Sequence, residues 1–449
     1  MEKIMMAKLW AIFLMVLVFA GSAQAAADGN MSRGGMRRLA GAPVAPVPIT
    51  LLTSAVGIGA VCMDGTPPAF HMDPGSGEGK NRWIVHLEGG SWCESLGSCL
   101  YRKASRLGSS DLMNKELMYF GGILSSSPAE NPGSYFLRFK ISTWSSSFIL
   151  SQNFLYVSMC VCPLLDFFSW NRVMIRYCDG ASFAGEGYDA GTGLFFRGQR
   201  IWNAVMQHLL SIGMSSADQV LLTGSSAGAL AVVLHCDQFG AFFAGRDTTV
   251  KCLADAGFFL DAVNVAGGRT LRSYFGGVVA THGVTQNLPT SCTDHLNATS
   301  CFFPQNIIGG IDTPIFVLNA AYDTWQIRES LAPDGADPSG AWRACKSNRL
   351  ACNELQMNIL QAFRNQMVVT VLRVVSRSRS NGYFINSCFT HGQTENPATW
   401  NAYDSPAIQN KTIWKSVGDW YFGRAEVRAI DCAYPCDYTC YHDMEDQLI

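Results

Sequence analysis

Short apolar runs alternate with segments of helical periodicity along most of the chain. The apolar residues of 194–214 recur at helical spacing, those of 226–239 continue as a helix, and a long helical pattern covers about 340–366. The runs that predict strands lie at 82–93, 171–180, 218–224 and 313–323. Strands that alternate with helices favour a mostly parallel sheet with helices on both faces, so the pattern predicts an α/β fold, and no internal repeat is visible.

The first residues do not belong to this pattern. Lys3 and Lys8 precede an apolar stretch, and Ala-Gln-Ala at 23–25 follows it, which is the arrangement of a secretory signal peptide over 1–25. An uncleaved membrane anchor is the alternative, but the apolar run is short for one. Residues 26–46 are rich in Gly, Ala and Pro and predict a flexible lead-in. The folded domain is expected to span 47–449, with no stable membrane anchor once the signal peptide has been cleaved.

The amino-acid composition restricts the classes of binding partner and the cellular compartment. The 449 residues carry a formal net charge of −2, so no overall field points to nucleic acid or an anionic membrane. Sixteen cysteines in a secreted chain indicate disulfides. Cys93 is expected to bridge Cys99, and Cys432, Cys436 and Cys440 are expected to staple the C-terminus. Without a histidine pair at ligand spacing, these cysteines are not read as a metal site. Glycan acceptor sequences stand at Asn30, Asn297 and Asn410.

The stretch Gly-Ser-Ser-Ala-Gly at 224–228 lies between a predicted strand and a predicted helix. It fits Gly-x-Ser-x-Gly, in which small neighbours allow the strained turn that presents a nucleophilic serine at a helix N-terminus. Ser226 is therefore the candidate nucleophile. An N-capping serine in a structural turn is the alternative.

A serine nucleophile needs a base and an acid that orients it, which in this fold follow in the order serine, acid, histidine. Asp323 ends an apolar strand, and His391 follows it in a turn-rich loop. Asp323 could instead cap a helix, and Asp255 is the reserve acid. Cys388 beside His391 would allow a thiol nucleophile, but a disulfide is favoured in a secreted chain.

An oxyanion formed during acyl transfer needs backbone donors. Gly89 and Gly90 follow the strand at 82–93 and could present unhindered N–H groups, and the N–H of Ala227 would complete the hole. The alternative is that the paired glycines only make a turn. This chemistry needs no cofactor.

Several stretches, spread over nearly the whole chain after about residue 47, together carry a family resemblance. They are VPITLLTSAVGIGAVCMDGTPPAFHMDPG, WIVHLEGGSWC, RLGSS, FGGILS, WNRVMIRYCDGASFAGE, LLTGSSAGAL, KCLADAGFFLD and FINSCFTHGQTE. Together they resemble plant pectin acetylesterases, which are similar to the Notum-type carboxylesterases. The resemblance implies an α/β-hydrolase fold, removal of acetyl esters from pectin, and the same assignments of Ser226, Asp323 and His391 and of the three backbone donors.

The chain departs from that family in two ways. The family typically reads Gly-Cys-Ser-Ala-Gly-Gly and His-Cys-Gln where Ser225, Ala229 and Gly392 stand here. One interpretation is that the two cysteines pair in relatives and that this tether is missing. Residues 133–165, apolar and without clear period, intervene where relatives run almost directly from NP into DFFSWNRV. A transmembrane helix or an irregular lid are alternatives, but a retained intron or gene-model error is the simplest account.

The sequence thus predicts a secreted, extracellular serine esterase that acts on acetylated pectin of the cell wall. A Notum-like esterase acting on lipidated protein is the second hypothesis, and preference for long acyl chains would favour it. A polysaccharide-binding relative without activity is the third, and it would bind pectin without hydrolysing an activated acetyl ester. The sequence does not indicate an oligomeric state.

Overall fold

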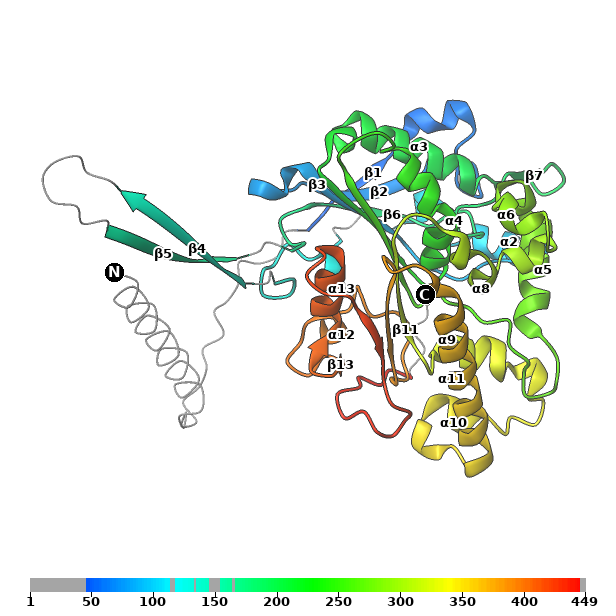
Figure 1. Cartoon of the computed structure of the whole chain (residues 1–449). Helices are drawn as coiled ribbons and strands as arrows, with labels where there is room; N and C mark the ends of the chain where they lie inside the picture. The colour runs from blue at the N-terminus through cyan, green and yellow to red at the C-terminus, as the bar shows by residue number, and fades with distance from the viewer. Residues whose placement is uncertain (1–45, 114–117, 133–134, 145–153, 164–165, 445–449) are drawn as a thin grey trace, which may run out of the picture. The chain divides into compact units, whose positions relative to one another are not determined.

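Nine strands form the central sheet of the computed structural model, in the order β1-β2-β6-β3-β9-β10-β11-β12-β15 (Figure 1). The structure describes residues 46–113, 118–132, 135–144, 154–163 and 166–444, all within one compact unit. The seven strands from β6 to β15 are parallel, and β1 and β2 add an antiparallel edge. The sheet strands are β1 Ile49–Leu51, β2 Ala69–Asp73, β3 Arg82–Leu87, β6 Asn171–Ile175, β9 Gln219–Ser225, β10 Thr249–Asp255, β11 Ile315–Ala320, β12 Gly382–Asn386 and β15 Arg428–Ile430.

Helices cover both faces of the sheet, as the alternating pattern predicts. The side chains of each inner strand alternate between two buried clusters: Val85 belongs to the cluster that contains residues of α3, α4 and α11, and Ile84 to the one that contains residues of α12 and α13. Both faces are therefore apolar, which is why these strands read as nearly continuous apolar runs. The helices are α2 Leu96–Lys103, α3 Gly198–Ser211, α4 Ala227–Ala241, α5 Thr270–His282, α6 Thr290–Thr293, α7 Ala298–Cys301, α8 Pro304–Ile307, α9 Thr324–Gln326, α10 Arg343–Ser347, α11 Glu354–Val374, α12 Pro397–Trp400 and α13 Ile413–Tyr421.

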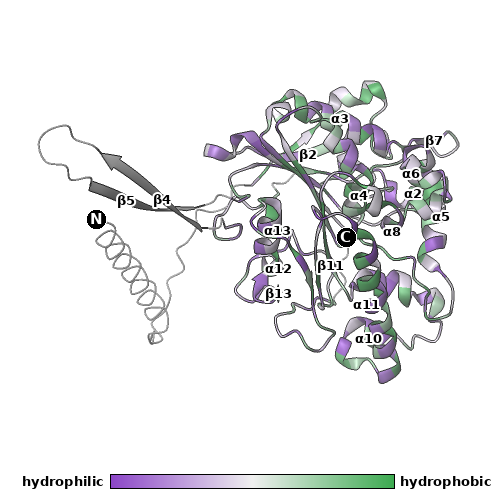
Figure 2. Cartoon of the chain, viewed as in Figure 1, coloured by the Kyte–Doolittle hydropathy of each residue, from purple (hydrophilic) through white to green (hydrophobic). Residues whose placement is uncertain are grey.

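The hydropathy of each helix depends on how deeply the helix is buried. Helix α4 is buried over nearly its whole length, whereas α3, α10 and α11 carry hydrophilic as well as hydrophobic residues (Figure 2). Among the described residues, the helices include none that combines the length and apolar character needed to cross a membrane.

One expectation about secondary structure was wrong. The helix expected over about 340–366 is two helices, α10 and α11, and the second extends to Val374. Asn353 begins α11 with a capping box in which its side chain accepts from Gln356 N–H, so the chain must leave helical geometry just before it. Within 133–165, the structure has a hairpin of β4 (Tyr135–Trp144) and β5 (Phe154–Pro163) that pair only with each other. Residues 1–45, which include the predicted signal peptide and nearly all of the predicted lead-in, lie outside the described residues.

Among the residues that the structure describes, seven disulfides join fourteen cysteines. The expected Cys93–Cys99 bridge is confirmed. At the C-terminus, Cys432 pairs with Cys436, and Cys440 pairs with Cys388, so the two bridges hold the C-terminal segment as expected. The other bridges are Cys62–Cys178, Cys236–Cys252, Cys292–Cys301 and Cys345–Cys352.

Candidate active site

Ser226 stands at the turn from β9 into α4, and its backbone is strained. Its φ of 57° and ψ of −123° lie outside the backbone conformations that residues other than glycine favour. The turn is this tight because the flanking glycines allow close packing: a Cβ at Gly228 would lie 2.0 Å from the carbonyl oxygen of Leu87 in β3. The Ser226 N–H donates to Asp255 O at 2.9 Å, which fixes the turn against β10. The strain therefore persists because three neighbouring segments enforce it.

The structure brings Ser226, His391 and Asp323 together in a single chain of hydrogen bonds. His391 Nε2 lies 2.8 Å from Ser226 Oγ, and His391 Nδ1 lies 3.0 Å and 2.9 Å from the two carboxylate oxygens of Asp323. All three side chains are buried, with residue exposures of 3%, 9% and 0% for serine, histidine and aspartate. An acceptor carboxylate at Nδ1 selects the tautomer with its proton there, which leaves Nε2 free to accept from the serine hydroxyl.

Asp323 also caps a helix, so the two interpretations of this residue are compatible. Its Oδ1 accepts from Gln326 N–H at 2.9 Å at the N-terminus of α9. The cap fixes the carboxylate beside His391, and the positive end of the helix favours its charge.

Asp255, the reserve acid, holds a different part of the histidine loop. Its Oδ2 accepts from Gln393 N–H at 2.6 Å and from the N–H and hydroxyl of Thr394 at 2.7 and 2.8 Å. Burial raises the pKa of the Asp255 carboxyl, and the three hydrogen bonds oppose that rise. Asp255 thus anchors the loop that carries His391. Cys388, the alternative nucleophile, is tied up in its disulfide with Cys440.

Gly89 and Gly90 lie against the nucleophile. A Cβ at Gly89 would lie 3.0 Å from Ser226 Cβ and 2.5 Å from Ser225 O, so only glycine fits there. Within the described parts of the chain, the N–H groups of Gly89 and Gly90 donate to no protein acceptor. Ala227 is the first residue of α4, where an N–H has no partner within the helix. The three predicted donors thus lie in segments adjoining Ser226.

A cavity of about 230 Å³ opens beside Ser226 and His391. Sequence reasoning missed its charged lining, which is drawn from the segments that flank the proposed site. The sequence signal for this lining was weak: Glu88 directly follows β3 and precedes the paired glycines, but its partners lie far away in sequence. The remaining residues that line the cavity are Glu88, Gly89, Arg106, Ser225, Gly392, Glu395 and Asn396.

Known proteins resemble this chain in both sequence and fold. Pectin acetylesterase 11 of Arabidopsis thaliana is 43% identical over 397 residues, which cover 88% of this chain and 92% of that protein. Palmitoleoyl-protein carboxylesterase notum1a of Danio rerio is 27% identical over 288 residues, covering 59% of this chain and 49% of that protein. A crystal structure of the Wnt deacylase Notum from Drosophila has a TM-score of 0.67 at 22% identity and covers 88% of this chain and 99% of that one. The last comparison confirms the expected α/β-hydrolase fold.

The family profile described as Pectinacetylesterase matches residues 41–139 and 164–441, and its match breaks off inside the predicted insertion. The two matched ranges include every predicted site residue. With this profile and a relative 43% identical over most of the chain, the protein belongs to the pectinacetylesterase family of esterases.

Proposed function

We propose that the protein is a secreted serine esterase that hydrolyses acetyl esters of cell-wall pectin. The observation that carries the proposal is the buried relay from Asp323 through His391 to Ser226 Oγ, with 2.8 Å between Nε2 and Oγ. Relatives named pectin acetylesterase support the substrate. Disulfides and the exposed glycan acceptors Asn297 and Asn410 support secretion.

The reaction proceeds in two balanced halves. Ser226 Oγ attacks the acetyl carbonyl carbon while His391 Nε2 takes the hydroxyl proton, and the new oxyanion accepts from the N–H groups of Gly89, Gly90 and Ala227. The C–O bond to the sugar breaks, and the sugar oxygen leaves with the proton from His391. Water then attacks the acetyl-enzyme, His391 takes its proton, and acetate departs as that proton returns to Ser226 Oγ. Asp323 stabilises the imidazolium in both halves.

The size and charge of the cavity favour a short acyl group. Glu88, Arg106 and Glu395 line it, and burying a long hydrocarbon chain against charged groups is unfavourable. The alternative activity on lipidated protein therefore has less support in this structure. Acetyl esters are expected to be cleaved with a higher kcat/KM than octanoyl esters.

Two neighbouring serines supply the test and its control. Ser226→Ala should lower acetate release from acetylated pectin by several orders of magnitude, because the nucleophile is lost. Ser225→Ala changes the adjacent residue, whose hydroxyl is not part of the relay, and should stay within a few-fold of wild type. Near-normal turnover by Ser226→Ala would reject the mechanism. Intact wild-type protein that binds pectin but hydrolyses no acetyl ester would instead support the third hypothesis, of a binding protein without activity.

A further inference from the structure

The cavity beside Ser226 has charged groups that the proposed ester chemistry does not use. An acetyl group is neutral, yet Glu88, Arg106 and Glu395 all line the space into which it would enter. Placing charges beside a neutral group is costly unless they do something else there. These charged groups are therefore expected to contact the part of the substrate next to the ester.

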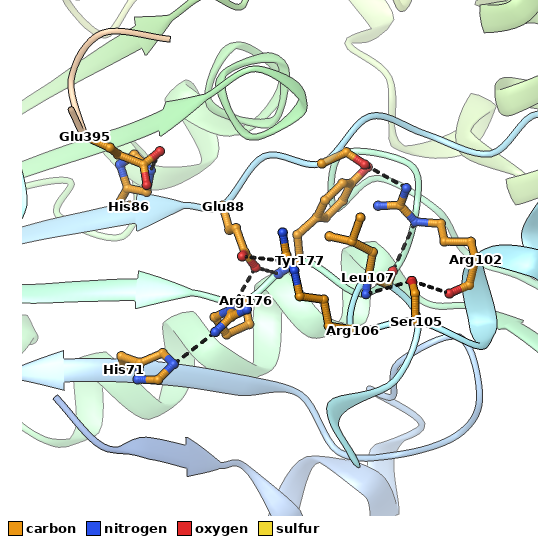
Figure 3. Close-up of polar contacts among 11 residues, drawn as sticks. His71, His86, Glu88, Arg102, Ser105, Arg106, Leu107, Arg176, Tyr177 and Glu395 are labelled. Atoms are coloured by element: carbon orange, nitrogen blue, oxygen red, sulfur yellow. Dashed lines mark hydrogen bonds and ion pairs between the residues drawn. The ribbon is translucent and has the colours of Figure 1, made fainter. Parts of the chain in front are cut away.

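Glu88 is the centre of a fixed charge network (Figure 3). Its Oε2 accepts from Arg176 Nε and from Tyr177 N–H, both at 2.8 Å, and its Oε1 accepts from an Nη of Arg106 at 2.8 Å. The Glu88 side chain is only 13% exposed. Because both oxygens are engaged, Glu88 acts here as the group that orients Arg106.

The two arginines differ in what they offer to a ligand. The Arg176 side chain is 5% exposed and donates a further hydrogen bond to His71 Nε2 at 3.2 Å. Burial lowers the pKa of His71, which keeps that imidazole neutral and able to accept. Arg176 therefore neutralises Glu88 inside the protein. Arg106 is 36% exposed and has one hydrogen bond to protein among the described residues, so most of its five donors remain available at the cavity wall.

The other carboxylate of the cavity, Glu395, is paired with a histidine and forms no ion pair with Arg106 among the described residues. Glu395 Oε1 lies 3.1 Å from His86 Nε2. Burial would raise the pKa of Glu395, but His86 and the arginines outweigh it and lower that pKa. Figure 3 shows Glu395 and His86 on the far side of Glu88 from Arg106. Arg106 thus shares the Glu88 carboxylate with Arg176, and its remaining N–H groups lie at the cavity wall.

We propose that Arg106 binds the carboxylate of the galacturonate unit whose acetyl ester Ser226 attacks. This inference rests on the proposed function, since pectin carries that carboxylate on the same sugar ring as the acetyl group. A planar guanidinium held from one side by Glu88 presents its remaining N–H groups to a second carboxylate. The enzyme should therefore prefer pectin with free carboxylates to pectin whose carboxyls are methyl-esterified.

The test compares one acetylated polygalacturonate before and after methyl esterification, using the full chain. For wild type, kcat/KM for acetate release should be about tenfold or more higher on the free acid, mainly through a lower KM, because a charge-assisted hydrogen bond is lost with the ester. Arg106→Gln should bring the ratio of the two values close to one. Arg106→Lys, which keeps the charge but loses the planar fork, should give an intermediate ratio. Arg379→Gln changes an exposed arginine outside the cavity and should keep the wild-type ratio.

The possible failures are distinguishable. If wild type releases acetate from both polymers and Arg106→Gln keeps the wild-type ratio, the inference about Arg106 is wrong while the proposed function stands. Equal losses on both polymers would show that Arg106 only supports the structure. If wild type releases acetate from neither polymer yet hydrolyses triacetin, the proposed substrate fails and the inference fails with it.

Discussion

Replacing each candidate acid by asparagine decides which of them serves His391. In Asp323→Asn, the amide still fits between His391 Nδ1 and Gln326 N–H, but it no longer favours the tautomer with the proton on Nδ1. Nε2 then carries the proton and cannot accept one from Ser226. In a serine hydrolase, the matching change lowers kcat by about 10⁴, or about 5 kcal/mol of transition-state stabilisation.

The same substitution at Asp255 should have a much smaller effect on the rate. The amide oxygen of Asp255→Asn can accept the three hydrogen bonds from Gln393 and Thr394, and its NH₂ takes the place of Oδ1, which has no hydrogen-bond partner among the described residues. We expect kcat within about tenfold of wild type and a loss of about 1–3 kcal/mol of stability for the unpaired amide. Asp255→Ala removes the acceptor from three donors and should cost at least about 3 kcal/mol.

The assay is kcat for hydrolysis of a soluble acetyl ester, with stability measured in parallel by urea unfolding. Both asparagine variants must show a cooperative unfolding transition for their rates to be compared. A loss of about 10⁴ in Asp255→Asn with near-normal turnover in Asp323→Asn would reverse the assignment. Equal, small losses in both would refute the relay as the source of the rate.

The remaining predictions concern the insertion, the missing tether and a buried acid. Deleting 133–165 should raise soluble secretion and keep esterase activity, because the hairpin pairs with no strand of the central sheet; a deletion that abolishes folding would refute this. Ser225→Cys with Gly392→Cys should form a disulfide, seen by peptide mass with and without reduction, because a Cβ at Gly392 lies 2.8 Å from Ser225 Oγ; free thiols at both positions would count against it. Burial raises the pKa of Asp179 from 3.8 to about 6, so the folded state retains a proton that the unfolded state loses, and stability falls as pH rises from about 4 to 6. In Asp179→Asn, the decrease in the free energy of unfolding over this pH range, measured by urea unfolding, should be smaller by up to about 3 kcal/mol. An unchanged pH profile would exclude Asp179 as the source of the decrease.

The sequence predicts the strands best where both faces of the sheet are buried. β3, β6, β9 and β11 were recognised as apolar runs because helices cover them on both sides. β10 and β12 have residues in the same two clusters and were not predicted. β15, with three residues, is too short for any period to show. The order of the strands depends on long-range pairing that no local pattern contains. The hairpin of β4 and β5 was missed although apolar and polar residues alternate over 137–142 in β4. The sequence of β5 is too uniformly apolar for such alternation to show.

The proposed triad could be predicted because it follows from topology. The carboxyl ends of parallel strands meet at one edge of the sheet. Ser226 follows β9 and Asp323 follows β11 at this edge, and only β10 lies between the two strands. The charged wall could not be predicted in this way. Glu88 is 88 residues from Arg176 in sequence, and only the pairing of β3 with β6 places the two side chains together.

The departures from the family pattern are accommodated by the packing around the elbow. Ala229 is fully buried, and a Cβ built on Gly257 would lie 2.4 Å from its methyl group. The methyl of Ala229 therefore occupies space that the glycine leaves open, so it does not force α4 away from the sheet. Ser225 and Gly392 likewise adjoin each other without a covalent link. The three hydrogen bonds from Asp255 to the segment after His391 hold that loop directly, which makes a second tether dispensable for keeping Nε2 near Ser226 Oγ.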